Sequence, residues 1–321
     1  MDCHLRGPAF LRDISHRTHS VCAALAASGL RRRQHGLVAA IAGAAHITAM
    51  FRCILLLLFL VLSSTARAQG PRAQPIRLNY EAYIAGFNMM EVEVGLWLRP
   101  ESYTLGLRSH TKGMIGALLH GESRTRVDGL FVGRSVVPSR YVSGGLWRGD
   151  RRLTDLVYES GRPVIRALVP ANDEDRDEVP ESLRRGSVDA LSAIVMLVHE
   201  VAQNGRCDGS AVTFDGRRAT KVSVGMVGME SLPAESRSSF KGEALHCRIS
   251  GRQVAGFPHD AGPDDYVRKP QVADVWFAAV LPGEPSIPVL LSFETRFLGH
   301  MNMYLVGAKV GADLGQYEPK D

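Results

Sequence analysis

Alternation of apolar and polar residues is the feature that most limits what this chain can fold into. Apolar and polar side chains alternate between residues 77 and 84, and the pattern repeats between residues 90 and 98. A period of two residues places successive side chains on opposite faces of a β-strand, so such a strand has one buried face and one solvated face. The pattern predicts further strands at residues 220–224, 245–249, 272–280, 289–297 and 301–310.

Turn residues separate these runs at short intervals. Glycine, proline, aspartate and asparagine cluster at residues 86–88, 100–102, 128–129, 160–161 and 215–216. Asp-Gly pairs are strong signals for a tight hairpin. Strands joined by hairpins form an antiparallel meander, so we expect a mainly β protein whose meander forms a curved sheet or a barrel.

Two segments break the β pattern. Residues 187–203 follow helical spacing, and we expect one helix there, begun by Ser187 and ended by Asn204-Gly205. Its broad apolar face predicts a helix packed onto the sheet or closing the barrel. The second segment, residues 111–120, is apolar and interrupted by glycine. It is either ordinary core packing at a crossover or a short helix plugging one end of the barrel, in which case the residues expected to line a ligand cavity are Met114, Ile115, Leu118 and Leu119.

Residues 50–68 have the three parts of a secretory signal peptide. Arg52 precedes a leucine-rich run at residues 53–62, and the small residues Ala66 and Ala68 predict cleavage between Ala68 and Gln69. The apolar run is shorter than the roughly 20 residues that span a bilayer. The sequence therefore predicts an exported, periplasmic protein with no transmembrane span in its mature chain.

The signal peptide divides the chain into three regions. We interpret residues 1–49 as an extension upstream of a start at Met50. The alternative is a twin-arginine export signal built on the arginines at 31–33. Residues 69–321 are expected to form a single β-rich domain.

Much of the excess positive charge lies in the leader. Eight of the 38 Lys and Arg residues precede Gln69, against two of the 33 Asp and Glu residues. The remaining chain is close to neutral, and its basic residues are scattered rather than clustered. Binding to nucleic acid needs a clustered basic surface, so the sequence pI of about 9.0 does not indicate a nucleic-acid partner.

Removal of the leader leaves two of the five cysteines, Cys207 and Cys247. In an oxidising compartment they are expected to form a disulfide that closes a loop of about 40 residues. The alternative is a pair of buried free thiols. A metal site has less support, because His246 adjoins Cys247 without a further cysteine or histidine at ligand spacing.

Several motifs together resemble a known family. They are the run from Arg166 to Pro170, the acidic stretch 172–180, Gly186 to Ser192, Asn204 to Gly209 and Phe214 to Arg218, with the 80–86 hairpin in front. This set resembles the family of domain of unknown function 3108 over residues 75–310. The resemblance implies a mostly β envelope protein of Gram-negative bacteria with Cys207 and Cys247 bridged, and it implies no activity.

A search for catalytic chemistry gives mainly negative results. The sequence has no nucleophile elbow, no phosphate-binding glycine loop and no His-Glu-x-x-His. The aspartates between 173 and 177 imitate a calcium loop, but Glu178 and Arg184 stand where glycine and glutamate are required. The pair to examine for a general base is His259-Asp260, in the long loop 255–270. Arginines 217 and 218 form a weaker candidate for binding a carboxylate.

These observations favour a non-enzymatic envelope protein whose barrel-like sheet binds an apolar or lipid-like ligand. The alternatives are an envelope scaffold that interacts with other proteins without a ligand, and a periplasmic hydrolase whose catalytic residues are assembled from distant positions. No catalytic residue, metal or cofactor is assigned. An apolar cavity above about 300 Å³ would favour ligand binding, and convergence of histidine with carboxylates would favour catalysis.

Overall fold

The computed structural model describes residues 74–113, 121–147, 149–171, 176–296 and 299–319. The chain divides into two units, Met1–Gln69 and Gly70–Asp321, and the described residues all belong to the second. The predicted cleavage site at Ala68 and Gln69 therefore lies outside the described residues.

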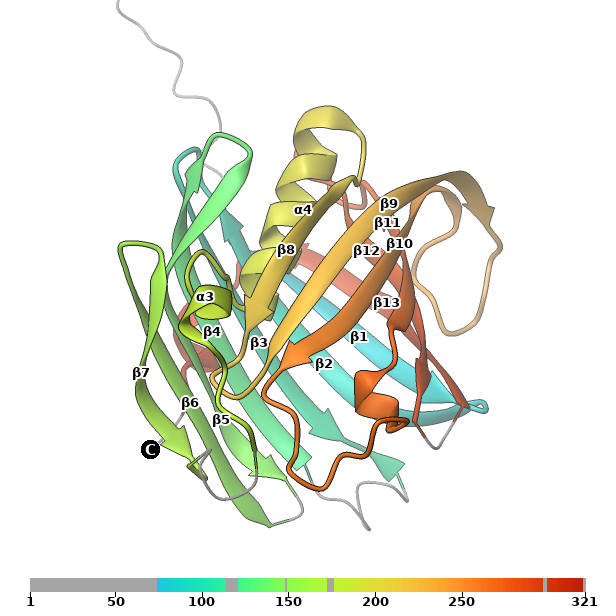
Figure 1. Cartoon of the computed structure of the whole chain (residues 1–321). Coiled ribbons are helices and arrows are strands. Elements are labelled where there is room, and N and C mark those ends of the chain that lie inside the picture. Colours follow the sequence, from blue (N-terminus) through green and yellow to red (C-terminus); the bar gives the residue numbers. More distant parts are fainter. Residues whose placement is uncertain (1–73, 114–120, 148, 172–175, 297–298, 320–321) are drawn as a thin grey trace, which may run out of the picture. The chain divides into compact units, whose positions relative to one another are not determined.

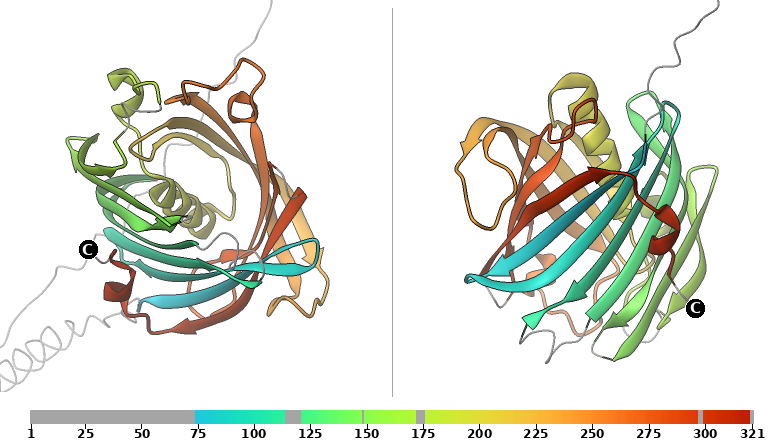
Figure 2. Two further views of the ribbon diagram at one scale, coloured as in Figure 1. Left: turned by 90° about the horizontal axis from the view of Figure 1, so that it is seen from below. Right: turned by 180° about the vertical axis from the view of Figure 1, so that it is seen from behind.

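Within the described residues, thirteen antiparallel strands form one sheet in the order β7-β6-β5-β4-β3-β2-β1-β13-β12-β11-β10-β9-β8. The sheet curves strongly around a central helix (Figures 1 and 2). The mainly β, barrel-like meander expected from the sequence is thus confirmed. The strands are β1 (Ile76–Ile84), β2 (Phe87–Leu98), β3 (Ser102–Thr111), β4 (Gly121–Val132), β5 (Ser135–Trp147), β6 (Asp150–Glu159), β7 (Arg162–Val169), β8 (Gly209–Phe214), β9 (Ala219–Leu232), β10 (Gly242–Ala255), β11 (Gln271–Ala278), β12 (Ile287–Thr295) and β13 (Gly299–Val310).

The meander is joined into one sheet by the pairing of β1 with β13, which leaves β7 and β8 as its two outer strands. The segment 176–188 lies between these two edges. Val188 forms a parallel bridge with Thr213 of β8, and the amide of Gly186 donates to the carbonyl of Gly161 in the turn between β6 and β7. A small core seals this junction, and its buried members are Leu156, Val179, Phe214, Ala219 and Ala255.

The helix α4 (Ala190–Asn204) lies within the curve of the sheet, as Figure 2 shows in the view from below. Its buried residues, including Val195 and Val198, pack into the main core. Gly205 ends it with φ +62°, as expected. The expected cap at Ser187 is wrong: Asp189 caps the helix by accepting from the amide of Ser192, while the Ser187 hydroxyl donates to the carbonyl of Arg184. The shorter helices are α3 (Glu181–Arg184), η2 (Tyr266–Arg268) and η3 (Leu314–Tyr317).

The turns expected at residues 160–161 and 215–216 join the strands as predicted, but the turn expected at Asp128-Gly129 is wrong. Both residues lie inside β4, and the chain turns only after Val132. Gly129 is required there because a Cβ at this position would lie 2.4 Å from the Tyr103 hydroxyl oxygen. The glycine therefore reflects packing against a neighbouring strand rather than a change of chain direction.

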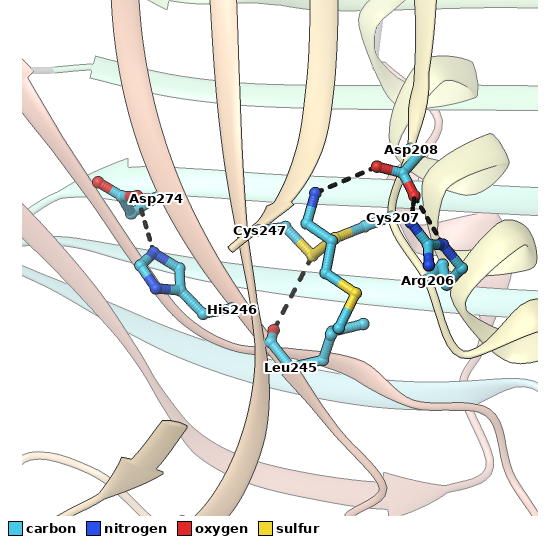
Figure 3. Close-up of a disulfide and its surroundings, with 8 residues drawn as sticks. Arg206, Cys207, Asp208, Leu245, His246, Cys247 and Asp274 are labelled. Atoms are coloured by element: carbon cyan, nitrogen blue, oxygen red, sulfur yellow. Dashed lines mark hydrogen bonds and ion pairs between the residues drawn. A yellow bond between two sulfur atoms is a disulfide. The ribbon is translucent and has the colours of Figure 1, made fainter. Parts of the chain in front are cut away.

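Cys207 and Cys247 form a disulfide in the structure, with their Cα atoms 6.1 Å apart (Figure 3). Neither residue is exposed to solvent. Cys207 follows α4 and Cys247 lies in β10, so the bond ties the connection between α4 and β8 to a strand two places from β8 in the sheet.

Candidate functional site

An open cleft of about 360 Å³ lies between α4 and the edge of the sheet formed by β8, β9 and β10. Its lining is mainly apolar. The helix contributes Ile194, which is 40% exposed although it is a large apolar residue. The larger apolar side chains that line this α4 cleft are Ile194, Met196, Leu197, Val222, Val224 and Ile249. One side of α4 therefore borders an apolar cleft.

Charged groups stand among the lining of the α4 cleft, and they are already paired. Arg134, in the turn between β4 and β5, donates from Nε to the Glu200 carboxylate at 3.0 Å and makes a second bond to the same group. Asp208 accepts from Arg206 Nε at 2.9 Å and from the amide of Met226 at 3.3 Å, contacts drawn in Figure 3. The hydrogen bond from Arg206 lowers the pKa of Asp208. Because these charges are neutralised locally, the cleft presents an apolar floor to a ligand.

The four residues expected to line a cavity from the other side, Met114, Ile115, Leu118 and Leu119, lie outside the described residues. That they line a ligand cavity stays a prediction.

A buried chain of hydrogen bonds surrounds the amino end of α4. The Ser192 hydroxyl donates to the Asp189 carboxylate at 2.6 Å, and the Tyr103 hydroxyl lies 2.8 Å from the same Ser192 oxygen. Tyr158 donates to Asp189 at 3.5 Å. Asp189 is fully buried, and this burial raises its pKa. The arrangement caps the helix and satisfies buried polar groups, so its role is structural.

Histidine and carboxylates do converge at one place, on the face of β10 opposite the disulfide (Figure 3). His246 lies with Nδ1 3.1 Å from Glu230 and Nε2 2.8 Å from Asp274, and its ring stacks on Trp276 with 4.4 Å between centroids. Burial opposes ionisation of Asp274, but hydrogen bonds from Arg248 and His246 lower its pKa.

This convergence does not make a general base. A general base needs a nitrogen free to accept a proton. Both ring nitrogens of His246 already face a carboxylate. Within the described ranges no serine, threonine or cysteine side chain is hydrogen-bonded to His246. The cluster therefore ties three neighbouring strands together.

The other residues singled out in the sequence do not come together with one another in one site. His259 faces Asp177 at 3.8 Å, and 53% of its side chain is exposed. Arg218 pairs with Asp215 in its own turn at 2.8 Å, and Arg217 donates to the carbonyl of Pro170 at 2.5 Å. Among the described residues, no group of three or more His, Cys, Asp or Glu side chains is placed to hold a metal ion. No helix in that part of the chain is long and apolar enough to cross a membrane.

The chain is similar to one protein family in sequence and to a solved structure in fold. The model of the family described as "Protein of unknown function (DUF3108)" matches residues 79–306. A solved structure of a β-barrel-like protein of domain of unknown function DUF1849 from Brucella abortus is similar, with 12% sequence identity and a TM-score of 0.46 over 75% of this chain and 99% of that one. The search of curated proteins gave no match.

Proposed function

Because the chain belongs to the DUF3108 family of proteins of unknown function, its function has to be argued from its own residues, and we propose that it is a non-enzymatic binding protein for an apolar or lipid-like ligand in the α4 cleft. The observation that carries this proposal is the cleft itself. Its volume of about 360 Å³ lies within the range of ligand sites, about 300 to 1,000 Å³.

The exposure of Ile194 supports the same conclusion. A large apolar side chain at the wall of a concave site gains free energy when a ligand removes it from water, at about 25 cal/mol per Å² of apolar area. The surrounding charges of Arg134, Glu200 and Asp208 are paired with protein groups and demand no charged ligand. An apolar molecule therefore matches the cleft better than an ionic one.

The experiment compares Ile194→Asp with Val310→Asp. Val310 is 47% exposed, similar to Ile194, and it does not line the cleft. The probe is N-phenylnaphthylamine, whose fluorescence rises in an apolar site. The wild type should bind the probe, and Ile194→Asp should weaken binding about tenfold or more, because a carboxylate facing an apolar ligand is poorly solvated.

The control variant and unfolding midpoints in urea separate lost binding from lost folding. Val310→Asp should bind like the wild type. A wild type that binds no probe and yields no lipid on solvent extraction would contradict the proposal and favour a scaffold that works through protein contacts. If Ile194→Asp and the wild type bind the probe with equal affinity, the α4 cleft is not the binding site.

We further propose that the protein acts in the periplasm after removal of residues 1–68. The signal-like sequence at 50–68 and the disulfide support this proposal, since disulfides persist in oxidising compartments. Mass spectrometry of the periplasmic protein should give an amino terminus within two residues of Gln69. Residues 50–68 retained on an exported protein would contradict it.

A further inference from the structure

A second cavity, of about 200 Å³, opens on the concave face of the sheet toward the end where β3 finishes and β4 begins. Strand register explains its chemistry. One row of cross-strand partners on β3 to β6 faces the core. It consists of Leu105, Val127, Tyr141 and Leu156, each paired with the next on the adjacent strand. The next row on the same face is Leu107, Thr125, Ser143 and Thr154. The row after that is Ser109, Ser123, Gly145 and Arg152.

The inward face thus changes from apolar to hydroxyl-bearing within two residues on β4, β5 and β6, and within four residues on β3. Hydroxyls are costly on a face that packs against a dry core, so this part of the inward face suits water or a polar ligand rather than apolar side chains. Ser109 and Ser123 share one hydrogen bond of 2.8 Å, and Thr125 and Ser143 share one of 2.9 Å. Each hydroxyl can donate one hydrogen bond and accept two, so these pairs keep capacity for a ligand.

An aromatic ring lies beside the hydroxyls. Trp147, at the end of β5, lines the cavity with 44% of its surface exposed. It packs over Gly121, where a Cβ would lie 3.0 Å from the indole ring. A flat, partly exposed indole next to a band of hydroxyls suits a sugar ring, whose C–H face packs on the aromatic surface while its hydroxyls form hydrogen bonds.

Two guanidinium groups add a preference for negative charge. Arg152 and Arg217 both line the cavity, and Arg217 is oriented by its hydrogen bond to the carbonyl of Pro170. The acidic residue among the lining, Glu122, is paired with Arg108 and Arg124. Arginine binds carboxylates and phosphates through charge-assisted hydrogen bonds.

We propose that this hydroxyl cavity binds an acidic sugar, that is, a sugar ring carrying a carboxylate or a phosphate. The site is separate from the α4 cleft, and the proposal does not depend on a ligand there. Hydroxyls of Ser123, Ser143 and Thr154 would contact the ring, Trp147 would pack against its apolar face, and Arg152 would pair with its anionic group.

The test is isothermal titration calorimetry of the exported protein with glucuronate, glucose-6-phosphate, glucose and inorganic phosphate. At least one of the two acidic sugars should bind tenfold or more tightly than glucose and than phosphate, and the comparison of the two distinguishes a carboxylate from a phosphate. Binding of neither acidic sugar at millimolar concentration would overturn the proposal. Phosphate binding as tight as that of glucose-6-phosphate would also overturn it, because the sugar ring would then contribute nothing.

Variants locate the site. Arg152→Gln should weaken binding of the acidic sugar about tenfold. Arg151→Gln, at the neighbouring residue on the other face of β6, should leave the affinity for the acidic sugar unchanged. Thr154→Val keeps the side-chain volume and should weaken binding of the acidic sugar several-fold. Unfolding midpoints in urea check that each variant folds. Unchanged affinity in both Arg152→Gln and Thr154→Val would place any binding elsewhere and refute the assignment.

Discussion

Breaking the disulfide between Cys207 and Cys247 should destabilise the protein by about 4 kcal/mol. The two residues are separated by 40 positions in the sequence. In the chain-entropy model, opening a loop of that length returns about 13 cal/mol/K to the unfolded chain, or about 4 kcal/mol at room temperature. For a domain of this size each kcal/mol corresponds to about 2 to 4 °C, so the melting temperature should fall by about 8 to 16 °C.

Reduction of the wild type is the cleanest perturbation, because it changes no side chain. Urea unfolding with and without reductant gives the difference in unfolding free energy. The control is the double variant Cys207→Ala, Cys247→Ala, whose unfolding free energy should be the same with and without reductant. Alkylation before reduction should leave both thiols unlabelled.

The bond also has a local consequence. It ties the connection after α4 to β10, and both α4 and β10 contribute walls of the α4 cleft. Reduction should therefore weaken probe binding at temperatures where the protein is still folded. A difference in unfolding free energy below about 1 kcal/mol, with labelling that proves reduction, would refute the loop-entropy reasoning.

Two further predictions concern residues whose roles only the fold reveals. Gly106→Ala should destabilise the protein by about 1 to 3 kcal/mol, measured by urea unfolding, because the new Cβ would lie 2.4 Å from the buried ring of Tyr317 and displace the carboxyl-terminal segment; an unchanged midpoint would show that this segment does not pack there. Asp189→Asn should gain stability relative to the wild type as the pH rises above about 4, the unfolded pKa of aspartate. Burial raises the pKa of Asp189 in the folded protein, so the wild type loses stability as the pH rises from about 4 to that raised pKa. Asparagine keeps a cap acceptor for the Ser192 amide and carries no charge. Equal pH dependence of both proteins would contradict the assignment.

Local sequence patterns were enough to predict the positions of seven of the thirteen described strands, most of the turns that they marked and the helix α4. Side-chain alternation follows from the geometry of two successive residues, so residues 77–84 and 90–98 could be assigned to strands without knowledge of their neighbours. Helical spacing did the same for α4. The pairing of the two cysteines was the expectation from their number once the leader was set aside, with a pair of buried free thiols as the alternative.

Contacts between distant residues were outside the reach of those patterns. Gly129 looked like a turn residue because the ring of Tyr103, on the next strand, left no trace in the local sequence. Asp189 rather than Ser187 caps α4, where Ser192 and Tyr103 form a buried hydrogen-bond chain that only packing assembles. The convergence of His246 with two carboxylates likewise required three neighbouring strands.

Both cavities were decided by tertiary structure. Each serine and threonine of the hydroxyl cavity occupies an inward position that alternation can assign to one face of its own strand. Strand order and register alone place Ser109 opposite Ser123 and Ser143 opposite Thr154, and so turn single hydroxyls into a continuous polar band. The α4 cleft likewise exists because the sheet curves around the helix, and curvature is a property of thirteen paired strands rather than of any one segment.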